Sequence, residues 1–401
     1  MTKRPFEIVL FSTLFPHKGE PTLGIFVENR LRQLVAQENI AVTVIAPVPW
    51  FPFKTRLFGK YSRMARANDT EVREGITIYH PRYFILPKVG MNLTPSFMYW
   101  AALSCFRRLL AKGKKIDLID AHYLYPDGVA AGRIASRLDI PLILTARGSD
   151  VTEIAKLKQP KKMIIQAIDK AFHVITVSNN LRRDLVEMGV DGAKISTLRN
   201  GVDLVKFSPS SSSEVSRRWG PGPVLLFSGW LIDRKRVDLF LEVAALIPGL
   251  TAVVVGDGPL KSGLQAMAKT LGIEKRVIFH GQVSPEEMPD IYRAADVLLL
   301  PSDREGWANV LLESMACGTP VVTRAIGGAP DFITDRAAGI VVDSAKPEDL
   351  SEAVLDLIEN PPGQTNTRAF AENFDWRSTS KGQMKIFEAA IENDLTMLSR
   401  D

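Results

Sequence analysis

The stretch Asp303-Arg-Glu-Gly-Trp-Ala-Asn-Val-Leu-Leu-Glu313 carries two carboxylates, Glu305 and Glu313, eight positions apart. An apolar run of the type that forms a buried strand precedes it, at residues 297–300. A helical stretch follows, and a second apolar run comes at residues 321–323. Strand, turn, helix and strand in this order predict a βαβ unit, with Glu305 on the turn and Glu313 in the helix.

In such a unit the turn lies at the carboxyl edge of a parallel sheet, where open α/β folds bind ligands. The start of the helix offers free backbone N–H groups and the positive end of the helix dipole, and both favour a phosphate. We expect the N–H groups of Ala308, Asn309 and Val310 to bind the distal phosphate of a nucleotide. Glu305 is then placed to hold hydroxyls beyond that phosphate, and Glu313 to reach a ribose diol. The spacing therefore predicts a nucleotide-sugar site.

Short apolar runs alternate with amphipathic stretches along both halves of the chain. The runs are residues 6–11, 40–46, 76–79, 116–119, 141–145 and 174–177 in the first half, and 224–227, 252–255, 277–279, 297–300, 321–323 and 340–342 in the second. Strands that alternate with helices predict an α/β fold with two doubly wound parallel sheets. Segments rich in serine, proline and glycine at residues 208–213 and 220–223 are typical of a linker. We therefore expect a domain at 1–205 and a second at 206–375.

The composition is that of an ordinary folded protein. The 401 residues are 46% hydrophobic and 24% charged, and the length favours two or three domains. Cys105 and Cys317 are too few for a disulfide framework, so a reducing compartment is expected. The first apolar run is too short for a signal peptide, and no uncharged apolar stretch reaches the length of about 18 residues that crosses a bilayer. The sequence thus predicts a cytoplasmic protein without a membrane span.

Charge is divided unevenly between the two halves. Residues 1–200 carry 30 Lys and Arg against 17 Asp and Glu, a balance of +13, while the remainder carries 20 against 28, a balance of −8. Residues 53–66 hold five cations and no acid, interleaved with Phe, Leu, Tyr and Met. Such a segment suits an anionic membrane surface. The alternative is an ordinary solvated face, and no nucleic-acid-binding motif accompanies the charge.

The Glu-x7-Glu pattern resembles the signature of retaining glycosyltransferases of family 4. Further motifs of that family occur in order along nearly the whole chain: Gly24-Ile-Phe-Val27, Asp120-Ala-His122, Tyr125-Pro-Asp-Gly128, Thr145-Ala-Arg-Gly-Ser-Asp150, Asn200-Gly-Val-Asp203, Arg234-Lys235, Gly256-Asp-Gly-Pro259 and Cys317-Gly-Thr-Pro320. The resemblance implies the GT-B fold, two Rossmann-like domains facing a central cleft. It also implies that the last helical stretch, 376–401, returns to the first domain.

Transfer of a glycosyl group requires stabilisation of the departing diphosphate. No Asp-x-Asp metal motif stands out, so we expect protein cations in that role, with no metal and no cofactor. By resemblance, Lys235 matches the family's lysine, Trp230 stands where an arginine is usual, and Arg234 is expected to replace that arginine. The division of roles between Arg234 and Lys235 stays open. The set expected to act in catalysis is Glu305, Lys235, Arg234 and His122; Gly229, Val283, Gly306 and Trp307 complete the expected donor-binding set.

Four residues of the first domain are also implicated by the resemblance. Gly24 lies where the family's glycine-rich loop approaches the diphosphate, although Leu23 holds the place of the usual second glycine. His122 ends a strand, and the family's histidine there touches the transferred sugar. Arg147 and Asp150, at the next strand end, are expected on the acceptor side. Many relatives have histidine where Arg147 stands, which favours an acceptor with phosphate or carboxylate.

These features together predict a retaining glycosyltransferase that uses a nucleoside-diphosphate sugar. The expected acceptor is a lipid-linked saccharide of a bacterial surface or exported polysaccharide, reached by peripheral contact with the membrane. Two alternatives remain. A nucleotide-sugar epimerase shares the architecture but usually carries additional acids and histidines, and a non-catalytic nucleotide-sugar sensor would not need the set of Glu305, Glu313, Lys235 and His122.

Overall fold

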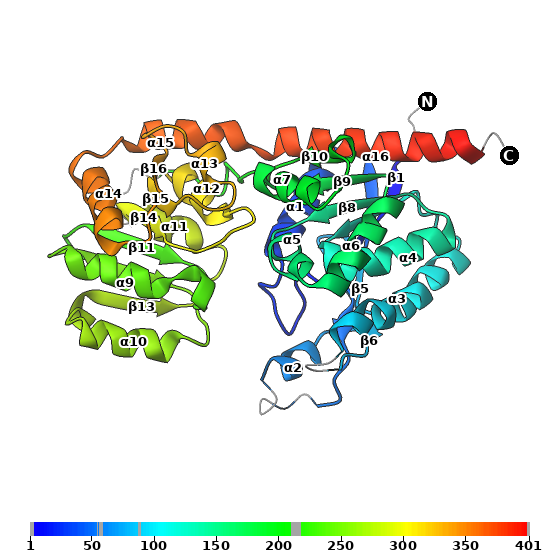
Figure 1. Ribbon diagram of the computed structural model, residues 1–401, viewed down its shortest axis with the longest axis horizontal. Helices are drawn as coiled ribbons and strands as arrows, with labels where there is room; N and C mark the ends of the chain where they lie inside the picture. The colour runs from blue at the N-terminus through cyan, green and yellow to red at the C-terminus, as the bar shows by residue number, and fades with distance from the viewer. Residues whose placement is uncertain (1–3, 54, 56–58, 87–89, 210–217, 399–401) are drawn as a thin grey trace. The chain divides into compact units, whose positions relative to one another are not determined.

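The computed structural model describes residues 4–53, 55, 59–86, 90–209 and 218–398. The chain forms two compact units, each built on its own largely parallel sheet (Figure 1). Unit 1 comprises Met1–Arg199 and Arg377–Asp401, and unit 2 comprises Asn200–Trp376. The division falls at Asn200 rather than at residue 206, because the intervening residues bond to unit 2: the Val202 N–H donates to Phe374 O, and Arg368 donates to Leu204 O.

The sheet of unit 1 has the strand order β10-β9-β8-β7-β1-β2-β5-β4. Its strands are β1 (Phe6–Phe11), β2 (Ile40–Ile45), β4 (Thr70–Arg73), β5 (Ile76–Tyr79), β7 (Leu118–His122), β8 (Leu142–Ala146), β9 (His173–Thr176) and β10 (Ile195–Thr197). The pairs are parallel except that of β4 with β5. A separate parallel pair joins β3 (Val48–Pro49) to β6 (Arg82–Tyr83).

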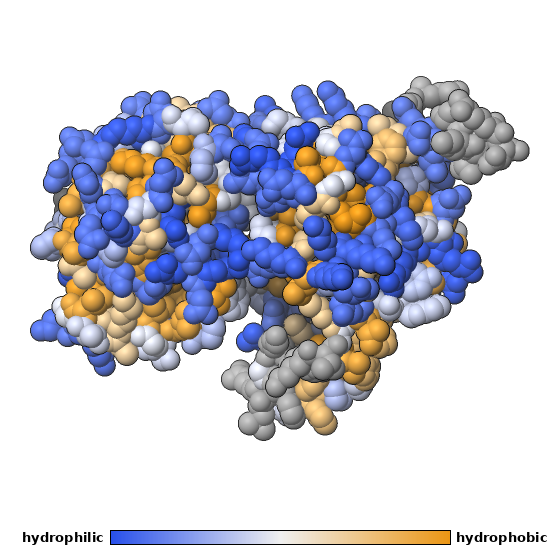
Figure 2. All heavy atoms as spheres, viewed as in Figure 1, coloured by the Kyte–Doolittle hydropathy of each residue, from blue (hydrophilic) through white to orange (hydrophobic). Residues whose placement is uncertain are grey.

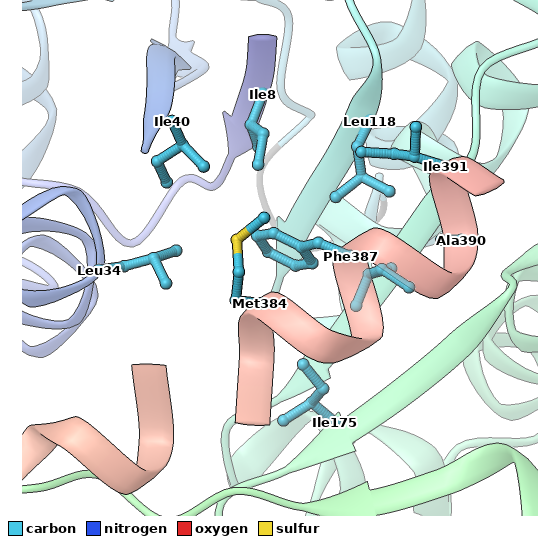
Figure 3. Close-up of a cluster of buried hydrophobic side chains, with 10 residues drawn as sticks. Ile8, Leu34, Ile40, Leu118, Ile175, Met384, Phe387, Ala390 and Ile391 are labelled. Atoms are coloured by element: carbon cyan, nitrogen blue, oxygen red, sulfur yellow. The ribbon is translucent and has the colours of Figure 1, made fainter. Parts of the chain in front are cut away.

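Helices cover the sheet of unit 1. They are α1 (Ile25–Gln37), α2 (Gly59–Met64), α3 (Thr94–Ala111), α4 (Val129–Leu138), α5 (Ser149–Thr152), α6 (Lys158–Lys170), α7 (Asn179–Glu187) and, after the chain returns from unit 2, α16 (Trp376–Leu398). Met384, Phe387 and Ile391 of α16 pack among buried side chains of the strands, such as Ile8 and Leu118 (Figure 3). This contact secures the C-terminal helix on unit 1. No helix among the described residues is long and apolar enough to cross a membrane.

The sheet of unit 2 has the order β13-β12-β11-β14-β15-β16, and its pairs are parallel. The strands are β11 (Val224–Ser228), β12 (Thr251–Val255), β13 (Val277–Gly281), β14 (Val297–Leu300), β15 (Val321–Arg324) and β16 (Gly339–Val342). The helices are α9 (Val237–Leu246), α10 (Lys261–Thr270), α11 (Met288–Arg293), α12 (Asn309–Ala316), α13 (Ala329–Phe332), α14 (Pro347–Glu359) and α15 (Gln364–Ala371). Counted along the chain, this is the order 3-2-1-4-5-6 of dinucleotide-binding sheets.

The predicted strands of both sheets are present, but three features were not predicted. The edge strand β4 is antiparallel, β10 adds a strand beside β9, and β3 and β6 pair outside the main sheet. β4 alternates exposed and half-buried residues and has few apolar side chains, so its apolar pattern is weak. β10 has three residues, too short for a periodic signal.

Candidate functional site

The candidate donor site lies at the switch point of the unit 2 sheet. β11 and β14 are neighbours in the sheet, with Leu225 beside Val297. After β11 the chain continues to β12 on one side of this pair, and after β14 it continues to β15 on the other side. A crevice forms outside the strand ends at such a point and is the usual ligand site of open α/β sheets. The segment after β11 carries Lys235, and the segment after β14 carries Glu305. Residues 70 positions apart therefore meet at one place, as the sequence predicts.

Glu305 binds both predicted cations. Its Oε1 accepts from Lys235 Nζ at 2.6 Å, and its Oε2 accepts from Arg234 NH1 at 3.4 Å. Arg234 NH1 also donates to the carbonyl oxygen of Arg304 at 3.2 Å. The side chains of Glu305 and Lys235 are 10% and 12% exposed, whereas that of Arg234 is 38% exposed. Arg234 is thus the cation of the pair that solvent or an incoming anion reaches more easily.

The electrostatics of this cluster keep Glu305 ionised. Burial by itself would raise the pKa of the carboxyl group, but the charges of Lys235 and Arg234 outweigh burial and hold the pKa below its ordinary value. An ionised carboxylate only accepts hydrogen bonds, so it suits hydroxyl donors of a sugar. The two cations, held by one carboxylate, leave a net positive charge at the switch point, which suits a diphosphate.

Gly327 is a site residue that the sequence predictions missed. It follows β15 with φ +52°, and a Cβ at this position would overlap the carbonyl oxygen of Glu305. Only glycine allows the backbone to approach Glu305 so closely in this conformation. The Gly327-Gly328 pair after a strand was the available signal.

The helix after Glu305 begins where predicted. Ala308 is the N-cap residue of α12, whose first residues are Asn309 and Val310. The side chain of Asn309 accepts a hydrogen bond from Asn200 Nδ2 at 3.2 Å. No side chain caps this terminus, so backbone N–H groups at the start of α12 have no capping acceptor from a side chain. They are placed to bind an anion, as expected for a distal phosphate.

Trp307, a member of the expected donor-binding set, lies on the turn before α12. Its side chain is buried, with its ring 4.8 Å from that of Phe332 and 6.5 Å from that of Phe374. It belongs to an aromatic cluster in the core of unit 2. A strand-to-helix turn can send one side chain inward while its neighbours face the edge, and contact between Trp307 and a donor stays a prediction. Gly306, next to it, is half-buried.

Glu313 lies on α12 with one carboxylate oxygen held. Its Oε2 accepts from the hydroxyl group of Tyr292 at 2.7 Å. Burial raises the pKa of Glu313, and the Tyr292 hydrogen bond and the charge of Lys206 oppose that rise. Tyr292 is fully buried on α11, and the sequence held no pattern that pairs it with Glu313. Tyr292 therefore orients the carboxylate that is predicted to bind the ribose.

The other predicted donor-binding positions of unit 2 also follow strand ends. Gly229 comes directly after β11, and its N–H donates to Val255 O at 3.0 Å. A Cβ on Gly229 would stand 3.5 Å from Cε of Lys235, so a larger side chain there would crowd the lysine. Val283 is half-buried, two residues after β13. Their contact with a nucleotide stays a prediction.

Unit 1 has a corresponding switch point between β1 and β7. His122 ends β7, and its carbonyl oxygen accepts from Ser12 Oγ after β1 at 3.1 Å. The imidazole ring is 1% exposed, and both ring nitrogens are engaged: Nε2 with Asp120 Oδ2 at 2.9 Å and Nδ1 with Arg147 NH2. Burial lowers the pKa of His122 to about 4 despite the opposing charge of Asp120. The ring is thus neutral at pH 7 and partnered by protein, rather than open to a sugar as predicted.

The two residues expected on the acceptor side have different surroundings. Asp150 is fully buried, and its carboxylate accepts from the backbone N–H groups of Leu124 at 2.8 Å and Gly148 at 2.7 Å, as well as those of Arg147 and Val151. A carboxylate so occupied organises the loop after β8, which corrects its assignment to the acceptor. Arg147 is also buried, at 9% exposed, with its guanidinium carbon 5.5 Å from the ring centroid of Phe26. Its contact with an acceptor stays a prediction.

Gly24 is the N-cap residue of α1, with φ +62°. A Cβ there would overlap the carbonyl group of Leu14 in the loop after β1. Glycine is thus required both by the left-handed conformation and by the close approach of the loop. The geometry explains why Gly24 is a glycine, and this explanation does not need a second glycine at position 23. A group of three or more metal-binding side chains does not occur within the part of the chain that the structure describes.

Solved structures identify the fold. Sucrose-phosphate synthase from Thermosynechococcus elongatus is similar with a TM-score of 0.79 and 18% identity, over 97% of this chain and 100% of that chain. Anabaena Alr3699/HepE, solved in complex with UDP and glucose, is similar with a TM-score of 0.71 and 19% identity, over 95% of this chain and 99% of that chain. The fold is the GT-B fold of two Rossmann-like domains, as predicted.

Sequence comparison then gives the family. Residues 23–206 match the model of Glycosyltransferase Family 4, and residues 212–374 match that of Glycosyl transferases group 1. D-inositol 3-phosphate glycosyltransferase from Mycobacteroides abscessus is 31% identical over 296 residues, which are 69% of this chain and 66% of the relative's length. The putative teichuronic acid biosynthesis glycosyltransferase TuaC from Bacillus subtilis is 27% identical over 87% of this chain and 88% of its own. The chain belongs to glycosyltransferase family 4, as its motifs predict.

Proposed function

We propose that this glycosyltransferase moves a sugar from a nucleoside-diphosphate donor with retention of configuration at the anomeric carbon. The observation that carries the proposal is the cluster of Lys235, Arg234 and Glu305 at the switch point of unit 2, with a 2.6 Å contact between Lys235 and Glu305. A preorganised charge cluster of this kind acts where negative charge develops on a leaving group. Relatives of the family, and the neighbour solved with UDP and glucose, support a donor of this class.

In this proposal the donor diphosphate replaces part of the hydrogen bonding between Glu305 and its two cations, Lys235 and Arg234. Arg234, the more exposed cation, meets the diphosphate first, and Lys235 shares its charge between the phosphate oxygens and Glu305. The start of α12 binds the distal phosphate. Glu305 then accepts hydrogen bonds from hydroxyls of the sugar. Neutralisation of the leaving group is assigned to protein cations, with no cofactor.

The proposed acceptor is a lipid-linked saccharide that carries an anionic group, in the synthesis of a bacterial surface or exported polysaccharide. TuaC, named for teichuronic acid biosynthesis, supports a saccharide acceptor. The inositol 3-phosphate enzymes show that a relative can instead use a small phosphorylated acceptor. Arg147 directly follows the carboxyl end of β8, and its guanidinium suits an anionic group in either case.

Peripheral contact with a membrane is proposed through an aromatic surface on unit 1. Its exposed members include Trp50, which stacks on Phe84 with 5.7 Å between ring centroids, and Trp100, which is 64% exposed. Figure 2 shows apolar side chains gathered at the lower edge of unit 1, near the position of β6 in Figure 1. Tryptophan and phenylalanine beside cations suit the interface of an anionic bilayer. Of the predicted cations, Arg56 and the side chain of Lys60 lie outside the described residues, whereas Arg63 and Arg66 are described.

The decisive experiment incubates the protein with UDP-, GDP- and ADP-sugars and measures free nucleotide. Steady release that accelerates when a candidate acceptor is added supports the transferase. A changed sugar with the nucleotide retained or eliminated would instead indicate an epimerase, and binding without turnover would indicate a sensor. A panel of thermal shifts identifies the donor first, since a ligand at 100 times its Kd adds about 2.7 kcal/mol of apparent stability.

Membrane contact is tested separately with vesicles. Vesicles that contain anionic lipid are expected to retain the protein at low salt and to release it at about 1 M salt, where the Debye length falls to about 3 Å. Changing Arg56, Lys60, Arg63 and Arg66 to glutamate should abolish retention and leave slow hydrolysis of the donor. Equal retention on neutral and anionic vesicles would contradict the membrane proposal and favour a soluble acceptor.

A further inference from the structure

A buried chain of polar side chains lies behind the switch point of unit 1. It joins β7 to two helices that are distant in sequence. Arg30 on α1 donates through Nε to Gln383 Oε1 on α16 at 2.7 Å, and Gln383 Nε2 donates to Asp120 Oδ2 on β7 at 2.9 Å. Arg30, Gln383 and Asp120 are each at most 2% exposed. The chain continues from Asp120 to His122 and from His122 to Arg147.

The two arginines determine the direction of every hydrogen bond in this chain. A guanidinium group only donates, so His122 Nδ1 must accept from Arg147, and the ring proton must be on Nε2, which donates to Asp120. The same rule places the amide oxygen of Gln383 toward Arg30 and its NH2 group toward Asp120. Asp120 Oδ2 therefore receives donors from both sides, His122 from one and Gln383 from the other.

Gln383 separates two groups of opposite charge. Arg30 and Asp120 attract each other, since the charge of Asp120 supports the protonated form of Arg30. Gln383 lies between them and forms a hydrogen bond with each, so that Asp120 Oδ2 can continue to accept from His122 Nε2. Without the amide, the unpaired Nε of buried Arg30 would draw the carboxylate away, because a buried donor without an acceptor is costly.

The alternative is that Gln383 only fixes α16 to the sheet. The helix already packs there through Met384, Phe387, Ala390 and Ile391 (Figure 3). An apolar side chain at position 383 would extend that packing without the desolvation cost of a buried amide. Packing alone therefore does not account for the glutamine, whereas its two oriented hydrogen bonds do.

We propose that Gln383 is a positioning residue of the reaction: through Asp120 it holds His122 in the Nε2–H form, and His122 in turn orients the Arg147 guanidinium toward an anionic acceptor. The inference rests on the proposed function for the role of Arg147. It assigns to the C-terminal helix a part in arranging the acceptor side, which packing against the sheet alone does not require.

The test is nuclear magnetic resonance of histidine labelled with ¹⁵N and ¹³C, in the full chain at pH 7. The chain has five histidines, and His122→Asn identifies the His122 signals. In the unaltered protein Nε2 of His122 should give a protonated-nitrogen shift and Nδ1 an unprotonated one. Gln383→Leu should bring the two nitrogen shifts together, because Asp120 then leaves the ring, the ring loses the orientation that presents Nδ1 to Arg147, and both tautomers become populated.

Two further variants separate positioning from structure. Gln383→Glu keeps an acceptor for Arg30 but, when ionised, has no N–H for Asp120. His122 should therefore no longer be held in a single tautomer in this variant. The variant thus tests the inference even if Gln383→Leu fails to fold. Thr379→Val is the matched control, because Thr379 is buried on the same helix and donates to Arg199 O at 2.6 Å without contacting Asp120. It should keep the unaltered His122 spectrum.

An unchanged His122 spectrum in both Gln383 variants would overturn the inference, and so would an equal change in Thr379→Val. Neither readout depends on turnover. If no nucleotide sugar is consumed by the unaltered protein, the proposed function fails while the tautomer result still stands. If transfer is observed and the spectra do not change, the positioning role alone fails.

Discussion

The two switch points share a topology and differ in how their charges are satisfied. In unit 2, Lys235 and Arg234 share the single carboxylate of Glu305, and Arg234 is 38% exposed. In unit 1, His122 is 1% exposed and both of its ring nitrogens have protein partners. The first arrangement has charge to offer an incoming anion, whereas in the second both nitrogens of the imidazole are already engaged by protein. The comparison indicates that a strand end at the switch point can serve either for binding or for positioning.

The largest effect that we expect from this difference is a dependence of the free energy of unfolding on pH, caused by the buried imidazole of His122. Burial lowers the pKa of this imidazole from 6.5 to about 4, so between these values the unfolded chain binds a proton that the folded chain does not. Its contribution is complete above pH 6.5 and is lost as the pH falls toward 4, by about 3 kcal/mol for 2.5 pKa units. Urea unfolding from pH 4 to 7 should show this slope in the unaltered protein and not in His122→Asn.

Subtracting the stability curve of His122→Asn from that of the unaltered protein removes the contributions of other titrating groups that both proteins share. Burial raises the pKa of Asp127 to about 7, which favours folding at low pH, and lowers the pKa of His17 to about 4, which acts in the direction of His122. Parallel stability curves for the unaltered protein and His122→Asn would show that the imidazole is not held neutral by the fold.

The next effect concerns the charge cluster of unit 2. Glu305→Gln and Lys235→Ala should each lower kcat by about 100-fold, a loss of roughly 2.7 kcal/mol of transition-state stabilisation. Steady-state kinetics at saturating donor measures this. Asp303→Asn is the control, because Asp303 bonds to Arg324 and Arg236 instead of Lys235. A rate near that of the unaltered protein in either cluster variant would remove that residue from the mechanism.

A smaller effect is expected at Glu313, because a ribose contact is made equally before and during transfer. Glu313→Gln should raise the donor KM by about tenfold and leave kcat nearly unchanged. Tyr292 can still donate to the new amide oxygen, so the fold should persist. Glu352→Gln, on the exposed face of α14, serves as control. A loss confined to kcat would show that the roles of Glu305 and Glu313 were assigned wrongly.

The smallest effect is expected on the aromatic surface of unit 1. Trp100→Ser should weaken binding to anionic vesicles by about fivefold, roughly 1 kcal/mol, since the ring is only partly removed from water at an interface. Vesicle sedimentation at low salt measures the change. Leu246→Ser replaces an apolar side chain of α9 in unit 2 that is 46% exposed, and it should leave binding unchanged. Equal effects of the two substitutions would show that the surface has no special affinity for lipid.

Local sequence determined the elements of the donor site. Apolar runs followed by turn residues predicted β11 and β14, and a helix start after Glu305 predicted the N-terminus of α12. Because the carboxyl ends of parallel strands lie at one edge, the meeting of Lys235 with Glu305 was also predictable. The short range of these signals is the reason: strand alternation and helix starts depend on neighbours within a few positions.

Tertiary structure alone decided which side chains remain available. Trp307 is adjacent to the donor site in sequence yet packs in the core, and Asp150 is occupied by the backbone N–H groups of Leu124, after β7, and Gly148, after β8. Gln383 and Asp120 are separated by 263 positions and meet only because α16 packs on the sheet of unit 1. Burial and hydrogen-bond partners across such distances depend on how whole elements pack, and no local period in the sequence records them.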